Sequence, residues 1–293
     1  MELRFGPVVF VPGANSGRYP HCHSLYLEAE RKVLIDPASD LERLTQLRTD
    51  PGVDEVWLSH WHEDHFMYLG LFDEEHVRIG RPDALPLQSL DGLFAAYGMN
   101  EYERRMWGPI MTELFRFKPR YLDKFLVNDY PVDLGGVTVD VIPTPGHTPG
   151  HCSFFFREPG LLFLGDYDLT PFGPWYGDEG SDIDETIESV RRLSSLPARV
   201  WIASHEQGLF REEPGDLWDR YVNVIDKREE KLVDLLHEPR TMTEIVDARI
   251  VYAKPREPKH FFDFGERRLM GKHLERLIKA GAVVRDGDRY RRT

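Results

Sequence analysis

The sequence predicts a mixed α/β protein in which two β-sheets pack together with helices on the outside, followed by a smaller helical domain. Three observations predict this fold class. Short strand-like segments dominate the first part of the chain, later strands alternate with a helical pattern, and after about residue 212 long helical patterns take over. Such an order is typical of stacked sheets covered by helices. A length of 293 residues suits two domains.

The elements of the first part follow from composition and periodicity. Leu41, Leu44 and Leu47 have helical spacing and predict a helix over Asp36–Arg48. Residues 86–126 are rich in aromatic side chains and mainly helical in pattern, so we interpret them as an insertion. β-branched and aromatic residues predict strands at Val8–Val11, Ser24–Ala29, Lys32–Ile35 and Val53–Leu58.

Four more strands and one helix complete the predicted sandwich. The helix covers Asp184–Leu196 and lies between the last two of these strands, where Ser181 or Asp182 is a plausible cap. The strands are expected at Gly136–Ile142, Cys152–Phe156, Leu161–Leu164 and Arg199–Ala203.

The C-terminal part has the outline of a winged helix. Long helical patterns at Asp216–His237 and Phe264–Ala280 flank a capping box at Thr241–Glu244, and a hairpin pattern follows at 282–291. We therefore predict two domains, one over residues 1–212 and the other over residues 213–293.

The overall composition excludes several classes of protein. Fifty acidic and 37 basic side chains give a formal net charge of −13, which argues against a protein that coats nucleic acid. No apolar run approaches the ~18 residues of a membrane span, and the N-terminus lacks the features of a signal peptide. Two cysteines, Cys22 and Cys152, cannot form a disulfide framework. We expect a cytoplasmic protein with no membrane partner.

Histidines and carboxylates gather where the predicted strands end. Residues 60–65 have the sequence His-Trp-His-Glu-Asp-His and follow an apolar strand directly. A strand end is rigid, and the loop after it can direct several side chains to one point. Seven nitrogen and oxygen ligands exceed the four of a closed structural zinc site and suit two metal ions with open positions. The predicted ligands are His60, His62, Asp64, His65, His147, Asp166 and His205.

These seven residues resemble the signature of the metallo-β-lactamase superfamily, His-x-His-x-Asp-His followed by a later His, an Asp and a final His. The resemblance covers about residues 7–210 and implies an αββα sandwich with the metal site at one edge. It implies that His60, His62 and His147 hold the first metal. By the same resemblance, Asp64, His65 and His205 hold the second metal, and Asp166 bridges the two.

The phrase Thr144–His151, Thr-Pro-Gly-His-Thr-Pro-Gly-His, is similar to glyoxalase II and its hydrolase relatives. The C-terminal winged helix resembles that of a subgroup of cytosolic hydrolases with the same fold. Imidazole and carboxylate ligands suit zinc, but also iron or manganese. We expect two divalent ions, with zinc as the first choice.

The ligands and the resemblance together predict a dinuclear hydrolase that activates water to cleave an ester-like bond, with a thioester first. A thiolate with a pKa of ~8.5 leaves without a strong general acid. Asp64 and Asp166 are predicted to orient the nucleophile while they bind metal. The alternatives are a phosphodiesterase or ribonuclease of the same fold, a mononuclear iron persulfide dioxygenase, and a metabolite-binding sensor. The complete ligand set counts against the last two.

Aromatic residues near the ligands predict an apolar pocket for a small-molecule substrate with an apolar or aromatic acyl part. Packing between the insertion and the sandwich is the alternative interpretation of the segment after Asp166. In the resembling family a glycine usually follows the Asp-His pair closely, but here residues 66–69, Tyr68 among them, come before Gly70. The resemblance also implies that the strand carrying His23 lies near the site. The predicted pocket residues are His23, Tyr68, Phe172, Trp175 and Tyr176.

The C-terminal part carries more basic than acidic side chains. Residues 238–293 contain 14 basic and 9 acidic residues, and several of the basic ones follow one helical pattern. Such a helix can read DNA in its major groove, but the small charge excess argues against duplex binding. We expect this face to be solvated or to form a homodimer surface.

Overall fold

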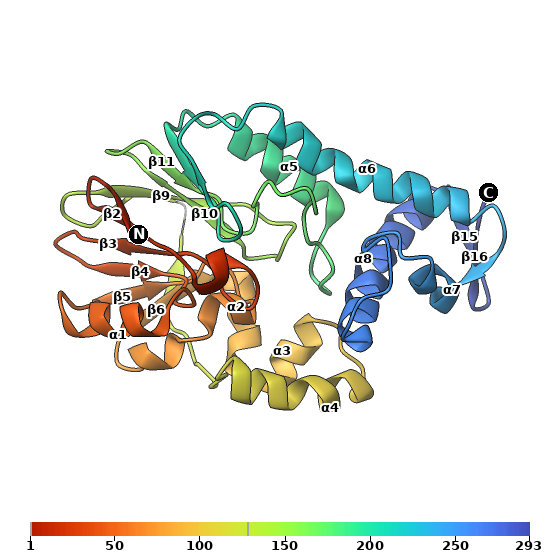
Figure 1. Cartoon of the computed structure of the whole chain (residues 1–293), viewed down its shortest axis with the longest axis horizontal. Helices are drawn as coiled ribbons and strands as arrows, with labels where there is room; N and C mark the ends of the chain where they lie inside the picture. The colour runs from red at the N-terminus through yellow and green to blue at the C-terminus, as the bar shows by residue number, and fades with distance from the viewer. Residues whose placement is uncertain (1, 128) are drawn as a thin grey trace.

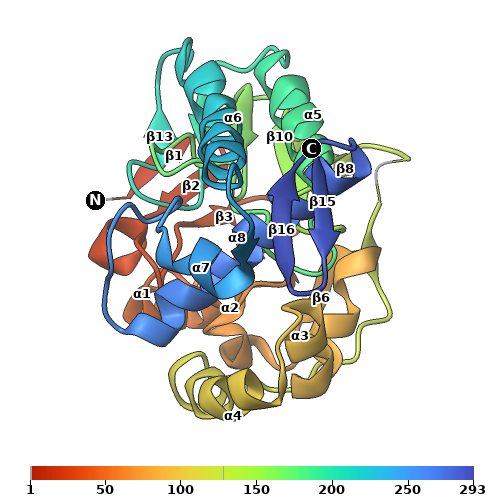
Figure 2. The same cartoon turned by 90° about the vertical axis from the view of Figure 1, so that its right-hand side faces the viewer.

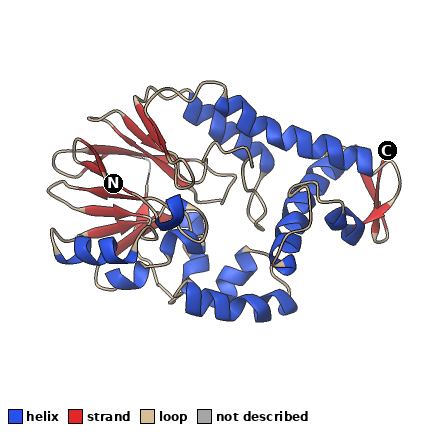
Figure 3. Cartoon of the chain, in the orientation of Figure 1, coloured by secondary structure: helices blue, strands red, loops and turns tan. Residues whose placement is uncertain are grey.

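The computed structural model describes residues 2–127 and 129–293. In this part of the chain two large sheets lie face to face, and helices cover the outer side of each sheet (Figure 1). A small third sheet lies at the end of the molecule beside the C-terminus (Figure 2). Colouring by secondary structure shows the layer order of helix, sheet, sheet and helix (Figure 3).

The N-terminal part of the chain forms the first sheet, in which the strands follow one another from β1 to β7. Pairing is antiparallel from β1 to β4 and parallel from β4 to β7. Helix α1 (Leu41–Thr49) covers this sheet and begins at Asp40, whose side chain accepts a hydrogen bond from the Arg43 N–H. The strands are β1 (Leu3–Phe5), β2 (Val8–Val11), β3 (Ser24–Leu27), β4 (Val33–Ile35), β5 (Glu55–Trp57), β6 (His76–Gly80) and β7 (Phe125–Leu126).

The second sheet has the order β13-β12-β11-β10-β9-β8. Strands β11 and β12 pair in parallel, and helix α5 (Ile183–Ser194) makes the crossover between them. The Asp182 side chain caps this helix by accepting a hydrogen bond from the Glu185 N–H, as predicted. The strands are β8 (Val132–Asp133), β9 (Thr138–Pro143), β10 (Cys152–Phe156), β11 (Leu161–Phe163), β12 (Val200–Ile202) and β13 (Leu209–Phe210).

The main core lies between the two sheets, and period-2 alternation explains how one strand serves two layers. On β2, Val8 and Phe10 face the second sheet, whereas Val9 and Val11 pack toward the helices. All four side chains are buried. The two sheets therefore form a rigid frame in which the strand ends, and the loops after them, have fixed positions.

A helical segment lies between β6 and β7 in sequence and at one edge of the sandwich (Figure 1). Helix α4 begins with a capping box between Asn100 and Glu103. The Trp107 ring lies 5.6 Å from the ring of Phe261, which belongs to the C-terminal part of the chain. The α-helices of this segment are α3 (Leu90–Ala96) and α4 (Glu101–Pro109), and the short helix α2 (Glu63–Phe66) precedes β6.

The C-terminal part consists of three helices and the small sheet with the order β14-β16-β15. The capping box of Thr241 and Glu244 is present at the start of α7. Helix α8 begins at Lys259, earlier than the predicted Phe264, because an ion pair between Lys259 and Asp263 supports an additional turn. The elements are α6 (Leu217–Leu235), β14 (Arg240–Thr241), α7 (Met242–Asp247), α8 (Lys259–Lys279), β15 (Val283–Asp286) and β16 (Arg289–Arg292).

None of the helices in the described residues is both long enough and apolar enough to cross a lipid bilayer.

Candidate metal centre

The seven predicted ligands converge at one edge of the sandwich, because all of them follow strand ends. The loop after β5 and the short helix α2 supply four of them from the first sheet. The loops after β9, β11 and β12 supply the other three from the second sheet. In the structure they form two groups of donor atoms, one of His60, His62, His147 and Asp166 and one of Asp64, His65 and His205.

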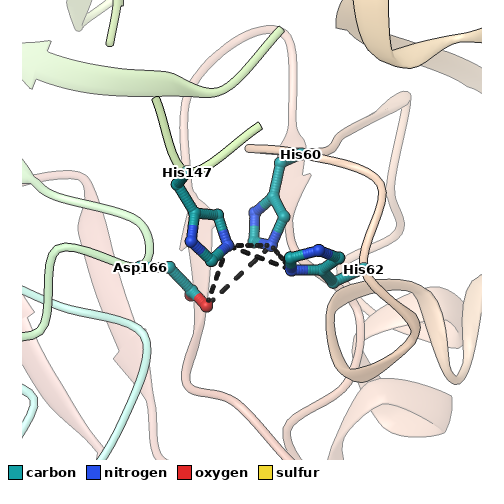
Figure 4. Close-up of side chains that lie close together, drawn as sticks. All are labelled: His60, His62, His147 and Asp166. Atoms are coloured by element: carbon teal, nitrogen blue, oxygen red, sulfur yellow. Dashed lines mark hydrogen bonds and ion pairs between the residues drawn. The ribbon is translucent and has the colours of Figure 1, made fainter. Parts of the chain in front are cut away.

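Three histidine nitrogens of the first group face a common point (Figure 4). His60 Nε2 lies 2.9 Å from His62 Nδ1, and His147 Nε2 lies 3.2 Å and 3.0 Å from these two atoms. Nitrogen ligands of a tetrahedral zinc ion, bound at about 2.0–2.1 Å, stand roughly 3.3 Å apart. The spacing of the three imidazoles therefore matches the spacing of metal ligands.

The second group lies on the other side of Asp166. His65 Nε2 and His205 Nε2 lie 2.9 Å and 3.3 Å from Asp166 Oδ1. The carboxylate of Asp64 is beside them, with Oδ2 at 3.5 Å from His205 Nε2 and Oδ1 at 3.9 Å from His65 Nε2. Two imidazoles and two carboxylates thus surround a second common point.

The two oxygens of Asp166 are divided between the groups. Its Oδ2 lies 3.4 Å from His147 Nε2 and 3.9 Å from His60 Nε2, while Oδ1 faces His65 and His205. A carboxylate in this position can contribute one oxygen to each of two adjacent cations.

Each of the five histidines has its other ring nitrogen bonded to an oxygen. Such bonds favour the proton on the outward nitrogen and leave the inward lone pair free for a metal. The outward partners are Ser59 Oγ for His60 (3.0 Å), Asp178 Oδ2 for His62 (2.7 Å), Asp36 Oδ2 for His65 (2.9 Å), Trp175 O for His147 (3.0 Å) and Gly17 O for His205 (2.7 Å).

The donor set fits divalent cations. Nε2 of His65 and Oδ1 of Asp166 are buried and only 2.9 Å apart, but neither atom makes a hydrogen bond. Buried polar atoms without partners are rare, and here both have lone pairs that face the same space. A cation placed there would satisfy both atoms.

Burial lowers the pKa values of these histidines and nearby carboxylates oppose it; in the first group the charge of Asp178 outweighs burial and raises the pKa of His62 to about 9. Burial lowers the pKa of His60 well below its usual value and that of His147 to about 4, so both are neutral imidazoles suited to metal binding. Burial acts in the same direction on His205, but the charge of Asp166 outweighs it and raises the pKa of His205 to about 10. The second group therefore favours positive charge beside its two carboxylates, which a divalent cation supplies.

Comparison with known proteins agrees with this arrangement. The sequence profile of the metallo-beta-lactamase superfamily matches residues 20–205. The chain belongs to the metallo-β-lactamase superfamily. The predicted family and the mixed α/β fold class are thereby confirmed, as is the predicted membership of a hydrolase superfamily.

Individual relatives of this metallo-β-lactamase superfamily member are distant. It is 26% identical over 196 residues to hydroxyacylglutathione hydrolase GloC of Haemophilus influenzae, a match that spans 63% of this chain and 84% of the relative. It is 25% identical over 198 residues to atrochrysone carboxyl ACP thioesterase of Aspergillus fumigatus, which spans 67% of this chain and only 38% of that relative.

The fold is shared over almost the full chain with a metallo-β-lactamase family protein from Thermus thermophilus. The TM-score is 0.75 at 24% identity, and the alignment covers 98% of this chain and 99% of that one. The C-terminal helices are therefore part of a fold that the two proteins have in common.

Two residues that sequence reasoning missed orient the histidines of this superfamily member. Asp36 directly follows β4 and also accepts hydrogen bonds from the backbone and side chain of Ser59, each at 2.7 Å. Its position after a strand end was the available signal, but Asp36 was assigned to the predicted helix over Asp36–Arg48 and was not considered as a site residue. Asp178 binds His62 and the Trp175 indole N–H. It lies in a long loop, where periodicity carries no information.

The C-terminal helices hold the loop that contains Asp178. Arg228 on α6 is buried and donates hydrogen bonds to the Phe172 carbonyl at 2.6 Å, the Pro174 carbonyl at 3.2 Å and the Tyr176 hydroxyl at 3.1 Å. Arg268 on α8 donates to the Gly177 carbonyl at 2.6 Å. The position of the loop beside the first metal group thus depends on two C-terminal helices.

A cavity of about 330 Å³ opens beside the two groups. His62, Asp64, Asp166 and His205 form its inner end. Aromatic side chains dominate its walls and come from five separate parts of the chain, which a single-sequence reading could not bring together. The main wall residues are Tyr19, Tyr97, Trp107, Phe172, Trp175, Tyr221, Tyr252, Phe261 and Phe264.

Two of the five predicted pocket residues line this cavity, namely Phe172 and Trp175. His23 does not, because its two ring nitrogens bond to the backbone N–H of Gly13 and the carbonyl of Glu206. These contacts place His23 in a structural role, which corrects the pocket prediction.

Tyr68 and Tyr176 also lie outside the cavity wall. The Tyr68 ring packs toward Arg116, whose guanidinium lies 5.3 Å from the ring centre. Tyr176 is fully buried, and its hydroxyl lies 2.9 Å from His273 Nε2. Their prediction as pocket residues is corrected. The loop that contains Arg116 packs on the Tyr68 ring, and α8 packs on the Tyr176 ring.

Glu63 forms a buried link between the centre and the helical segment. The Tyr19 hydroxyl donates to its Oε1 at 2.8 Å, and the Tyr97 hydroxyl donates to its Oε2. The Tyr97 ring also stacks on His62, with 5.5 Å between ring centres and 7° between planes. Residues 86–126 therefore support one face of the first metal group.

Proposed function

We propose that this protein is a dinuclear metal hydrolase that cleaves an ester-like bond, with a thioester as our first choice. The observation that carries the proposal is the division of Asp166, whose two oxygens face separate groups of histidines. A site for a single ion would not require the second group of Asp64, His65 and His205.

The proposed ligands are those predicted from the sequence. His60, His62 and His147 would hold one ion, Asp64, His65 and His205 the other, and Asp166 would contact both. Two divalent ions bound here would supply an activated water at neutral pH and polarise the carbonyl of the substrate. Zinc is our first choice, and iron and manganese suit the same ligands.

The residues of the chain itself orient the reaction. Asp64 and Asp166 border the space between the two groups, so their oxygens would direct the attacking water toward a carbonyl carbon in the cavity. The outward hydrogen bonds of the histidines keep this geometry in place before substrate binds. A thiolate with a pKa of ~8.5 then leaves without protonation by a strong acid.

The cavity supports a substrate with an apolar or aromatic acyl part. Its aromatic walls exclude water from the reacting carbon and bind such an acyl group by the hydrophobic effect. The names of two relatives, a hydroxyacylglutathione hydrolase and an acyl-carrier-protein thioesterase, support the choice of a thioester for this chain.

We also propose the predicted division of the chain, with residues 1–212 as the catalytic domain and residues 213–293 as a winged-helix domain. The second domain would complete the cavity through Tyr252, Phe261 and Phe264. A homodimer formed through its outer surface remains part of the proposal, and mass photometry of the full chain would test it.

Elemental analysis and a substrate panel test the proposed function. We expect about two ions of zinc, iron or manganese per chain, and hydrolysis of an aromatic acyl thioester that exceeds hydrolysis of bis(p-nitrophenyl) phosphate. His147→Ala should lose both metal and activity, whereas His237→Ala, at an exposed histidine, should lose neither.

Three results would contradict the proposal. Faster cleavage of the phosphodiester would favour the phosphodiesterase or ribonuclease. One iron per chain with oxygen consumption on glutathione persulfide would favour the dioxygenase. Two bound ions without hydrolysis of any substrate in the panel would favour a metabolite sensor.

A further inference from the structure

A short basic loop borders the mouth of the cavity. Residues 253–260, which follow α7 and include the first two residues of α8, are all exposed. The residues on either side of it, Tyr252 and Phe261, both line the cavity. We call residues 253–260 the rim loop.

Buried contacts fix the base of the rim loop. The carboxylate of Glu266, which is fully buried in α8, accepts hydrogen bonds from the backbone N–H groups of Val251 at 2.8 Å and Tyr252 at 3.2 Å. Arg249, also buried, forms an ion pair with Asp263. The loop is therefore held in place at its base, and its exposed side chains are presented beside the cavity.

Cations dominate the exposed part of the rim loop. Lys259 pairs with Asp263, and the one carboxylate of the loop, Glu257, accepts a hydrogen bond from the Lys259 backbone N–H. Among the described residues no carboxylate lies within ion-pair distance of Lys254 or Arg256. Two positive charges at the rim thus have no acidic partner.

Arg256 packs against a residue of the cavity wall. Its guanidinium lies 5.9 Å from the ring centre of Tyr252, a wall residue, and 5.7 Å from that of Phe262. Arg18 contributes a further guanidinium to the cavity lining and pairs with Glu206 at 2.9 Å. The cavity lining itself is acidic, with Glu63, Asp64, Asp166, Asp168 and Glu206, so Lys254 and Arg256 of the rim loop are the unpaired cations beside it.

We infer that Lys254 and Arg256 bind the phosphate groups of the thiol that leaves, so that the substrate is an acyl-coenzyme A. This inference rests on the proposed thioester hydrolysis and names its leaving group. With the acyl part against the aromatic walls and the carbonyl at the metal groups, the thiol part extends outward past the rim loop. Arginine and lysine are suited to phosphate recognition.

A nucleic-acid strand fits these observations less well. Binding a phosphodiester backbone takes a track of cations along several phosphates. The rim loop offers two unpaired cations beside an open cavity with aromatic walls, which suits a few phosphates attached to an apolar group.

A binding experiment tests the rim loop without catalysis. The probe is adenosine 3′,5′-bisphosphate, which has the nucleotide phosphates but no thiol, titrated into the metal-loaded full chain by calorimetry. We expect measurable binding that weakens roughly tenfold in Lys254→Ala/Arg256→Ala and weakens further as salt rises. The control Arg291→Ala/Arg292→Ala removes the same charge from exposed residues of β16, at the far end of the molecule (Figure 1), and should bind normally.

A kinetic experiment tests the substrate. Benzoyl-coenzyme A is compared with benzoyl-N-acetylcysteamine, which carries the same acyl thioester without the nucleotide. In Lys254→Ala/Arg256→Ala the ratio of the two kcat/KM values should fall about tenfold through KM of the coenzyme A ester. An unchanged ratio would overturn the inference.

The two proposals fail in different ways. Hydrolysis of neither ester by the native protein, with bisphosphate binding that still depends on the rim loop, would refute the thioesterase and keep a nucleotide-phosphate site. Hydrolysis of both esters without bisphosphate binding would refute the rim loop alone. Tighter binding of a single-stranded RNA, or of an acidic acyl carrier protein, than of the bisphosphate would also overturn the inference.

Discussion

The Asp178 carboxylate lies 2.7 Å from Nε2 of His62, and the other nitrogen of the same ring faces the first metal group. This contact links a loop more than a hundred residues away to the strand-end motif. It selects the ring orientation and the tautomer that His62 needs as a ligand. The predictions below begin with this pair.

Asp178→Asn should weaken binding of the first metal about 10–100-fold, because the amide is a poorer acceptor for the His62 N–H. Competition with a chromophoric chelator measures the dissociation constant. Asp219→Asn, an exposed residue of α6, is the matched control and should bind metal normally. Equal affinities for the Asp178 variant and the native protein would remove its orienting role.

Asp166→Asn should reduce the metal content from about two ions per chain to about one. An amide supplies one oxygen and one nitrogen with hydrogens, so it cannot offer a charged oxygen to both groups. Elemental analysis after dialysis gives the stoichiometry. Two tightly held ions in this variant would show that Asp166 does not bridge.

Arg228→Met should destabilise the protein by about 2–4 kcal/mol, because it leaves the Phe172 and Pro174 carbonyls without their donor. Denaturant unfolding measures the change, and Lys227→Met, at the exposed neighbouring position, serves as the control. Metal affinity should fall as well, because the released loop carries Asp178. A loss of stability with unchanged metal affinity would show that Arg228 holds the loop but does not affect the metal centre.

Phe261→Ala should raise KM for an aromatic acyl thioester roughly tenfold, since the ring covers part of the cavity wall. KM for the acetyl thioester of the same thiol should change little, because a methyl group does not reach that wall. Steady-state kinetics with the two substrates give the comparison. A proportional increase for both would place Phe261 outside the acyl site.

Asp83→Asn tests a pH effect away from the ligands. Asp83 is fully buried and accepts hydrogen bonds from the Thr148 hydroxyl and the Gly150 N–H, and burial raises its pKa to about 7. The native state therefore holds a proton that the unfolded chain releases near pH 4, so this group makes the native protein less stable as pH rises from 4 to 7.

The variant lacks that titration. We compare the free energy of unfolding of Asp83→Asn with that of the unsubstituted protein at each pH. The value for the variant minus the value for the unsubstituted protein should increase by roughly 2 kcal/mol between pH 5 and 7.5. Urea unfolding at several pH values measures this difference, with Asp91→Asn as an exposed control. A pH-independent difference would contradict the raised pKa.

Local sequence information was sufficient to predict that the seven proposed ligands converge and insufficient for what surrounds them. His60, His147 and His205 each follow a strand that hydrophobic patterning locates, so their convergence could be predicted from the rule that strand ends share an edge. Asp178 and Phe261 carry no such signal, because loop paths and helix docking depend on long-range packing.

The same reason explains the errors. Tyr68 and Tyr176 are aromatic and close in sequence to ligands, but proximity along the chain does not determine which way a loop residue points. The tertiary contacts of Tyr176 with His273 and Arg228 decide its direction, and both partners lie in the C-terminal part of the chain.

The metal ligands and part of the aromatic wall come from different parts of the chain, and this separation has an evolutionary consequence. The ligand side of the cavity comes from residues that follow strand ends of the two sheets, whereas Tyr252, Phe261 and Phe264 come from the C-terminal part of the chain. Exchange of that C-terminal part by recombination would change the cavity wall, and with it the substrate, without changing any of the proposed metal ligands. Arg228 limits such exchange, because any incoming unit must also supply a donor for the same loop.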